Sequence, residues 1–205
     1  MTINAVGRVV LHNVRLILNG GTTMSKTALL IIDMFNDFDF VGGEDLLRNT
    51  EPIVDPILKL KRHFKANDWP VIYCNDNFGQ WKDSTEDIIR HVESSKGSSI
   101  AKRIAPEDKE YFIIKPRHST FYGTQLDILL RQLEVTSLVL TGVASDICIL
   151  FSANDGYMRE YKLHVPRDCV AAETDKRNDS ALTVIHEALG ISTDDADTYI
   201  KDTQV

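Results

Sequence analysis

Short apolar runs alternate with longer segments of helical periodicity from residue 26 onward. Within each run the apolar residues are adjacent rather than at every second position, which is typical of strands buried on both faces of a parallel sheet. The runs predict strands over residues 27–33, 70–75, 111–115, 138–143 and 162–166, with a short further candidate at 198–200.

The segments between these strands show the spacing of amphipathic helices. Residues 51–65 place Ile53, Ile57, Leu60 and Phe64 close to one face. Further helices are predicted over 124–133, 145–161 and 174–189, and the last ends before a glycine, the residue type that commonly follows a helix. Strands that alternate with helices in this way predict an α/β fold of the doubly wound type.

The first 23 residues differ from the rest of the chain. Residues 8–18 are largely apolar, but polar residues such as His12 and Arg15 interrupt them and spoil the pattern of a secretory signal. We therefore expect two parts, an N-terminal extension at 1–23 without an assigned role and one domain over 24–205. A single hydrophobic core suits a domain of this length.

Composition and charge exclude several classes of function. Hydrophobic residues make up 43% of the chain, which is enough for a folded core and excludes disorder. The formal net charge of −7, without a basic run, argues against a nucleic-acid partner. The longest apolar runs span five residues, against about 20 needed to cross a bilayer, so no membrane partner is expected. Three cysteines without CxxC spacing, and no secretory signal, favour the reducing cytoplasm.

Three reactive side chains follow the predicted strands. Asp33 and Lys115 each end a strand, and Cys148 lies at the start of the helix after a third. Because ligands of open parallel sheets bind beyond the carboxyl ends of the strands, these groups are expected on one rim. Lys115 and the helix start, which Ser145 is placed to cap, favour a thiolate at Cys148. Asp33 is suited to accept the thiol proton.

Each of these residues also has an ordinary structural interpretation. Asp33 is suited to cap a loop, Lys115 to end an edge strand, and Cys148 to fill the core as free cysteines commonly do. A carboxylate, an ammonium group and a thiol at the same edge favour catalysis over three independent structural roles. Of the six histidines, only His118 follows a strand end closely enough to approach this rim.

The sequence resembles the isochorismatase-like cysteine hydrolase superfamily over about residues 25–190. Three ordered blocks carry the resemblance: ALLIIDMFNDF at 28–38, KPRHSTF at 115–121 and TGVASDIC at 141–148. It implies a three-layer (α/β/α), doubly wound fold with a six-stranded, mostly parallel sheet.

The resemblance also implies the roles of individual residues. Asp33, Lys115 and Cys148 correspond to the family's catalytic triad. A non-proline cis peptide is expected between Val143 and Ala144, with an oxyanion hole formed by the N–H groups of Ala144 and Cys148. Family members commonly form dimers or tetramers, so a homo-oligomer is expected.

One departure from the family bears on metal binding. Nicotinamidases of this superfamily hold a metal with an aspartate and histidines after the second strand, whereas this chain has NDNFGQW at 75–81, without histidine. We therefore expect no metal and no cofactor. Asp76 and His91 remain the alternative, as ligand types that suit a divalent ion.

Aromatic and amide residues near the strand ends are candidates for a substrate pocket. The loop at 75–81 suits either a small polar pocket or a set of turns with a packed tryptophan. The expected pocket residues are Phe38, Asn77, Trp81, Phe121 and Tyr122.

The function indicated by these residues is metal-independent hydrolysis of a small molecule. Because Cys148 is retained, the preferred reaction is cleavage of an amide-like C–N bond through a cysteine thioester. One alternative is hydrolysis of the vinyl ether of an isochorismate-type substrate, in which Asp33 is the acid and Cys148 a bystander. The other is a non-catalytic protein that binds a small molecule or serves as a scaffold.

Overall fold

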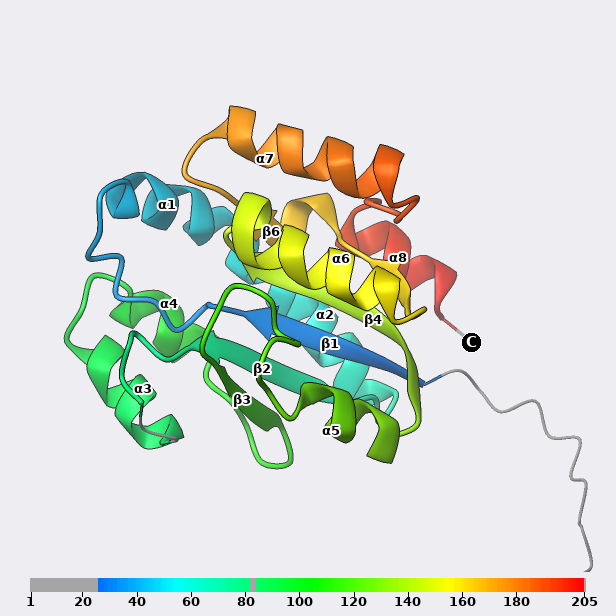
Figure 1. Cartoon of the computed structure of the whole chain (residues 1–205), viewed down its shortest axis with the longest axis horizontal. Helices are drawn as coiled ribbons and strands as arrows, with labels where there is room; N and C mark the ends of the chain where they lie inside the picture. The colour runs from blue at the N-terminus through cyan, green and yellow to red at the C-terminus, as the bar shows by residue number, and fades with distance from the viewer. Residues whose placement is uncertain (1–25, 82–83, 205) are drawn as a thin grey trace, which may run out of the picture.

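The computed structural model describes residues 26–81 and 84–204 (Figure 1). The expected extension at 1–23 lies outside the described residues. No helix within the described ranges is long and apolar enough to cross a membrane.

The centre of the fold is a parallel sheet of six strands. The strands are β1 (Lys26–Ile32), β2 (Val71–Asp76), β3 (Tyr111–Lys115), β4 (Val135–Val143), β5 (Lys162–His164) and β6 (Val170–Ala171). Their order is β3-β2-β1-β4-β5, and β6 also pairs with β4. Because every pair is parallel, the carboxyl ends of β1, β3 and β4 meet at one edge.

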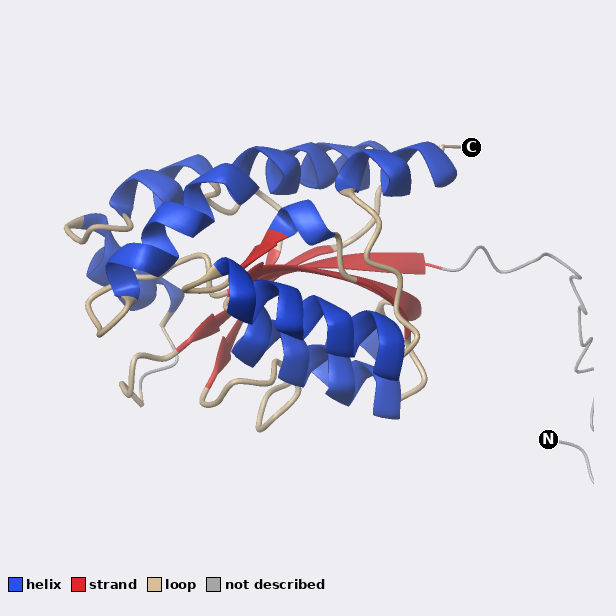
Figure 2. Ribbon diagram, turned by 90° about the horizontal axis from the view of Figure 1, so that it is seen from above, coloured by secondary structure: helices blue, strands red, loops and turns tan. Residues whose placement is uncertain are grey.

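Helices cover both faces of this sheet, which makes the three-layer α/β/α fold expected from the sequence (Figure 2). They are α1 (Gly43–Thr50), α2 (Val54–Ala66), α3 (Thr85–Glu93), α4 (Ser98–Arg103), α5 (Leu126–Gln132), α6 (Leu150–Met158), α7 (Asp175–Thr183) and α8 (Ala196–Asp202). A 3₁₀ turn, Glu51–Ile53, precedes α2.

The continuous apolar run of β1 is explained by its two buried faces. Leu29 and Ile31 face the core shared with α1, α2, α3 and α4, whereas Leu30 and Ile32 face the core shared with α5 and α6. Five of the predicted strands are present close to their expected positions. The helices that pack on both faces of the sheet therefore explain the continuous apolar run of this strand in the sequence.

The candidate strand at 198–200 is wrong, because these residues lie in α8. Asp195 caps this helix by accepting a hydrogen bond from the Thr198 N–H, so a capping residue outweighs the short β-prone run. The sequence prediction also lacked β6 and the short helices α1, α3 and α4.

Two predicted helices are interrupted rather than regular. The helix expected at 145–161 begins as a π-helical turn, Ser145–Ile149, before α6. The helix expected at 174–189 is α7 followed by a second π-helical turn, Val184–Ala188. The first of these turns contains Cys148, and such turns are frequent at functional sites.

Candidate active site

The carboxyl edge of the sheet brings Asp33, Lys115 and Cys148 together. Lys115 Nζ lies 2.9 Å from Asp33 Oδ2 and donates to Cys148 Sγ at 3.5 Å. All three residues are buried, with exposed fractions of 0% for Lys115, 5% for Asp33 and 9% for Cys148. The ends of β1 and β3 and the turn after β4 thus place the Asp33 and Cys148 side chains around Lys115.

The backbone at the end of β1 positions the Asp33 carboxylate. Asp33 adopts a left-handed conformation with φ of 52°, which turns the chain out of the strand. Its Oδ1 accepts the Asp76 N–H at 2.7 Å, so Oδ2 is the oxygen that faces Lys115. The carboxylate is therefore held between β2 and the lysine.

The Lys115 ammonium group uses all three of its donors. Besides Asp33 and Cys148, its third acceptor is the Arg117 carbonyl at 3.1 Å. Asp76 Oδ2 lies farther away, at 3.9 Å. Three short contacts to a fully buried lysine fix the ammonium group between the carboxylate and the thiol.

Burial dominates the protonation of the site. Burial raises the pKa of Asp33 above its ordinary value, although Lys115 opposes that effect. Burial alone would lower the pKa of Lys115, but the Asp33 and Cys148 charges leave that pKa raised. Burial and then the Asp33 charge raise the pKa of Cys148, against the opposing effect of Lys115.

Burial and the Asp33 charge thus oppose a thiolate at Cys148, whereas Lys115 favours one. Lys115 acts in the direction expected from the sequence, but the burial of Cys148 raises the pKa of its thiol. The reason is that the buried ion pair is neutral as a whole, and a thiolate would add an uncompensated negative charge to it.

The backbone around Cys148 has the expected unusual geometry. The peptide bond between Val143 and Ala144 is cis, and Ala144 is extended before the π-helical turn begins. Gly142 has φ of 111°, and a Cβ atom there would lie 2.0 Å from the Ile32 carbonyl oxygen. Ser145 does not cap the turn, since its Oγ is buried and has no hydrogen-bond partner among the described residues.

Asn75 braces the loop that follows Asp33, a role that the sequence did not indicate. Its Oδ1 accepts the Phe35 N–H at 3.0 Å, and its Nδ2 donates to the Phe35 carbonyl at 2.9 Å. The asparagine is buried, with an exposed fraction of 2%. An asparagine at the end of a predicted strand could have indicated this role, but its partner Phe35 is 40 residues away in the chain.

The expected pocket residues do not form one pocket. Phe38 and Phe121 lie in the hydrophobic core, with exposed fractions of 1% and 5%, and Tyr161 and Arg159 pack against the Phe121 ring. Trp81 is 85% exposed and, with Asn77, borders a hollow along the edge strand β3. Tyr122 is the one that lines a pocket together with His118.

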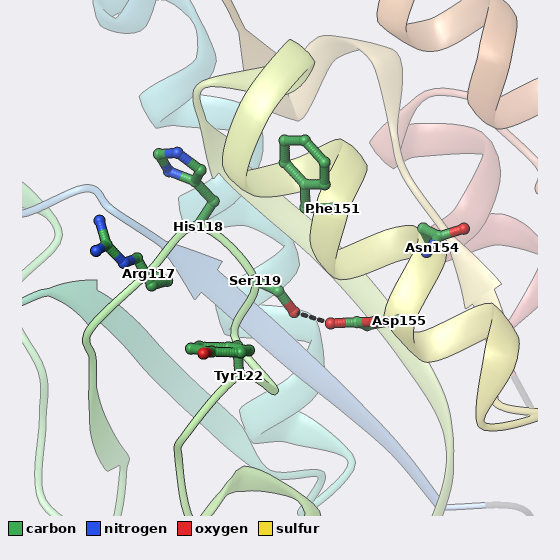
Figure 3. Close-up of a pocket in the computed structure, with 7 residues that line it drawn as sticks. All are labelled: Arg117, His118, Ser119, Tyr122, Phe151, Asn154 and Asp155. Atoms are coloured by element: carbon green, nitrogen blue, oxygen red, sulfur yellow. Dashed lines mark hydrogen bonds between the residues drawn. The ribbon is translucent and has the colours of Figure 1, made fainter.

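That pocket lies beside the thiol. His118 Nδ1 is 4.0 Å from Cys148 Sγ, and the pocket has a volume of about 390 Å³ (Figure 3). Its walls come from the loop after β3 and from α6.

The alternative metal ligands point elsewhere. His91 Nε2 contacts Asp37 Oδ2 at 2.7 Å, and Asp76 faces Lys115. Within residues 26–81 and 84–204, no group of three or more His, Cys, Asp or Glu side chains is arranged to hold a metal ion.

A three-layer α/β/α fold with a thiol, a carboxylate and an ammonium group at the carboxyl edge of its sheet is the arrangement implied for isochorismatase-like hydrolases. A family model described as Isochorismatase domain matches residues 27–197. The chain therefore belongs to the isochorismatase family of hydrolases, which confirms the resemblance seen in the sequence.

Similar proteins support the same family. The chain is 47% identical over 168 residues to the uncharacterized isochorismatase family protein YaaI of Bacillus subtilis, covering 81% of this chain and 93% of that protein. N-carbamoylsarcosine amidase from Thermoplasma acidophilum is 29% identical, with a TM-score of 0.64 over 84% of this chain and 97% of that one. The nicotinamidase SaPncA from Staphylococcus aureus is 26% identical, with a TM-score of 0.64 over 83% of this chain and 100% of that one.

Proposed function

We propose that the protein is a cysteine amidohydrolase that cleaves a C–N bond of a small molecule through a thioester on Cys148. The observation that carries this proposal is the position of Lys115 Nζ, in contact with both the Asp33 carboxylate and the Cys148 thiol. The amidase names of two structural neighbours, the N-carbamoylsarcosine amidase and the nicotinamidase, support an amide-like substrate.

In the first half of the reaction Cys148 Sγ attacks the carbonyl carbon and Asp33 accepts the thiol proton. The buried Asp33 has a raised pKa, which makes it a stronger base than an exposed carboxylate. Lys115 remains charged and stabilises the negative charge that moves from carboxylate to sulfur. The N–H groups of Ala144 and Cys148 stabilise the oxyanion.

Collapse of the tetrahedral intermediate breaks the C–N bond, and Asp33 returns the proton to the leaving nitrogen. A thioester remains on Cys148. Asp33 then accepts a proton from water, whose oxygen attacks the thioester carbonyl. Breakage of the C–S bond returns the proton to sulfur and releases the acyl product, so the site regains its starting protonation.

Ether hydrolysis is the second candidate, because a buried carboxyl group with a raised pKa also suits an acid that protonates a vinyl ether. In that reaction Cys148 forms no covalent bond. A non-catalytic role would not explain why Lys115 contacts the Cys148 thiol.

The test is turnover and intact mass of Cys148→Ser and Cys148→Ala, with Cys169→Ser as the matched control because Cys169 is another buried thiol, in the hydrophobic core. We expect an acyl adduct on the wild type, and no turnover by either Cys148 variant on a panel of small amides, ureas and isochorismate. A Cys148→Ala variant active on isochorismate would instead establish ether hydrolysis. Binding without turnover by the wild type would establish the non-catalytic role.

Three further properties belong to this proposal. The reaction is independent of metal, because the segment 75–81 offers no histidine, and prolonged treatment with a chelator should leave turnover unchanged. The protein acts in the cytoplasm, in keeping with three free cysteines. It assembles as a dimer or tetramer, which the mass in solution at several concentrations tests.

A further inference from the structure

The Cys148 sulfur has one buried neighbour and one exposed neighbour. Lys115 Nζ lies 3.5 Å from Sγ on a fully buried side chain, whereas Nδ1 of the exposed His118 ring lies 4.0 Å from Sγ. Cys148 itself is only 9% exposed. A carbon must come within about 3–3.5 Å of the sulfur before the sulfur can attack it. A reactant that arrives from solvent therefore meets the His118 ring.

Phe151 extends the surface that the His118 ring presents. The two rings stack with their centroids 5.9 Å apart and their planes 20° from parallel (Figure 3). Phe151 is 49% exposed, although large aromatic rings usually bury most of their surface. Because His118 belongs to the loop after β3 and Phe151 to α6, the stack joins these two segments beside the thiol.

Hydrogen bonds next to both rings hold the two segments together. Ser119 Oγ donates to the Asp155 carboxylate, and the Thr120 N–H donates to Ser152 Oγ at 3.0 Å. Both donors directly follow the histidine in the chain, and both acceptors lie in α6. Thr120 and Ser152 are fully buried. Buried support of this kind fixes the position of the two rings relative to the thiol.

We propose that His118 and Phe151 are specificity-determining residues, whose rings limit the size of the reactants that reach Cys148. A narrow group passes along the rings, whereas a branched group within a few bonds of the reacting carbon overlaps with the His118 ring. The inference rests on the proposed function in one respect, that Cys148 is the nucleophile. It adds that the substrate is unbranched close to the bond that is cleaved.

The test compares iodoacetamide with N-tert-butyliodoacetamide, which share the reacting carbon and differ in bulk. Peptide mass gives the alkylation rate of Cys148, and the branched-to-unbranched rate ratio is divided by the same ratio for glutathione. Both reagents react with the same thiolate, so any change in the pKa of Cys148 cancels from the ratio. We expect a wild-type ratio well below 1, and His118→Ala and Phe151→Ala to raise it by about 10-fold.

Two further variants separate the size of the ring from its other properties. His118→Phe keeps a flat ring that can stack on Phe151 but removes the ring nitrogens, so it should keep the wild-type ratio. Tyr157→Ala is the matched control, because Tyr157 is a similarly exposed ring on α6 that does not line the pocket beside the thiol. This variant should also leave the ratio unchanged.

Three results would overturn the inference. They are a wild-type ratio equal to that of glutathione, an unchanged ratio in both His118→Ala and Phe151→Ala, and a ratio in His118→Phe as high as in His118→Ala. Alkylation requires no turnover, so the outcome is independent of the proposed function. If the ratios change as expected but no amide is hydrolysed, the amidohydrolase proposal fails and the role of the two rings stands. If amides are hydrolysed and the ratios do not change, the reverse holds.

Discussion

Lys115 determines the chemistry of the site because its ammonium group is the only one in contact with both Asp33 and Cys148 among the described residues. A buried ion pair of this kind contributes little net stability, since desolvation offsets most of the attraction. The ion pair matters for the chemistry of the site because it places charged groups beside the Cys148 thiol. Asp33 and Lys115 act on the thiol in opposite directions, which makes their effects separable by experiment.

The rate of Cys148 alkylation against pH should change in opposite directions in two variants. Because the Asp33 charge raises the pKa of Cys148, Asp33→Asn should lower that pKa and speed alkylation at pH 8. Because Lys115 lowers the same pKa, Lys115→Met should slow alkylation. The wild-type thiol should itself react more slowly than free cysteine, whose pKa is about 8.5.

Iodoacetamide labelling followed by peptide mass measures these rates. Asp37→Asn is the control, because this carboxylate lies in the same loop and pairs with His91 instead. Equal rates in the wild type, Asp33→Asn and Lys115→Met would show that burial alone sets the reactivity of the thiol.

At the scale of secondary structure, the sequence predicted the elements whose pattern comes from burial on both faces. The runs that became β1, β2 and β4 are continuous, since both faces of these strands are buried, whereas the edge strands β3 and β5 are only partly buried. Helices α1, α3 and α4 have six to nine residues and few buried positions, so their periodicity is too short to recognise. The segment 198–200 has β-prone residues, but the cap at Asp195 and packing on α2 select a helix.

The ion pair between α7 and the turn that carries Cys148 is a second element-scale feature. Arg177 Nε donates to Asp146 Oδ2 at 2.5 Å, and its guanidinium also contacts Glu173. Asp146 Oδ1 is buried without a hydrogen-bond partner among the described residues, so this carboxylate depends on Arg177. We expect the pair to tie α7 to the π-helical turn two residues before the nucleophile.

A double-mutant cycle with Arg177→Ala and Asp146→Asn should give a coupling free energy of about 1 kcal/mol in urea unfolding, because the pair is only partly buried. The matched pair is Arg90 and Asp87, which lie three residues apart on α3 and are more exposed. Their coupling should be at most about 0.5 kcal/mol. Equal coupling in the two pairs would mean that the Arg177 pair has no special role in holding the turn.

For the whole molecule, the parallel topology explains why the triad could be predicted and the pocket could not. Reactive residues at strand ends must share the carboxyl edge, whatever the intervening sequence, so Asp33, Lys115 and Cys148 were accessible to sequence reasoning. The pocket lined by His118 and Tyr122 depends on how α6 packs against the loop after β3, and the spacing of these segments in the sequence does not encode that packing. The burial of Phe121 was not predictable for the same reason, since it comes from Tyr161 and Arg159, which pack against its ring.

The close contact between β1 and β4 leads to a last prediction about the whole sheet. Gly142 pairs with Ile32 in the centre of the sheet, directly before the Val143–Ala144 peptide. A Cβ atom there would lie 2.0 Å from the Ile32 carbonyl oxygen, and the φ of 111° is unfavourable for any other residue. Gly142→Ala must therefore push β1 and β4 apart.

Both overlap and backbone strain contribute to the expected loss, so Gly142→Ala should reduce the free energy of unfolding by about 3 kcal/mol or more. Gly190→Ala is the control, because Gly190 also has a positive φ, of 66°, but no atom lies within 4 Å of its added Cβ. That substitution should cost only about 1 kcal/mol, from the left-handed conformation alone. Urea unfolding measures both values. The difference between them reports the steric overlap together with the greater strain at φ of 111°, and equal losses would show that β1 and β4 separate without cost. If the overlap dominates, Asp33 and Cys148 move apart with their strands, and the surviving folded fraction of Gly142→Ala should lose the alkylation response to Asp33→Asn.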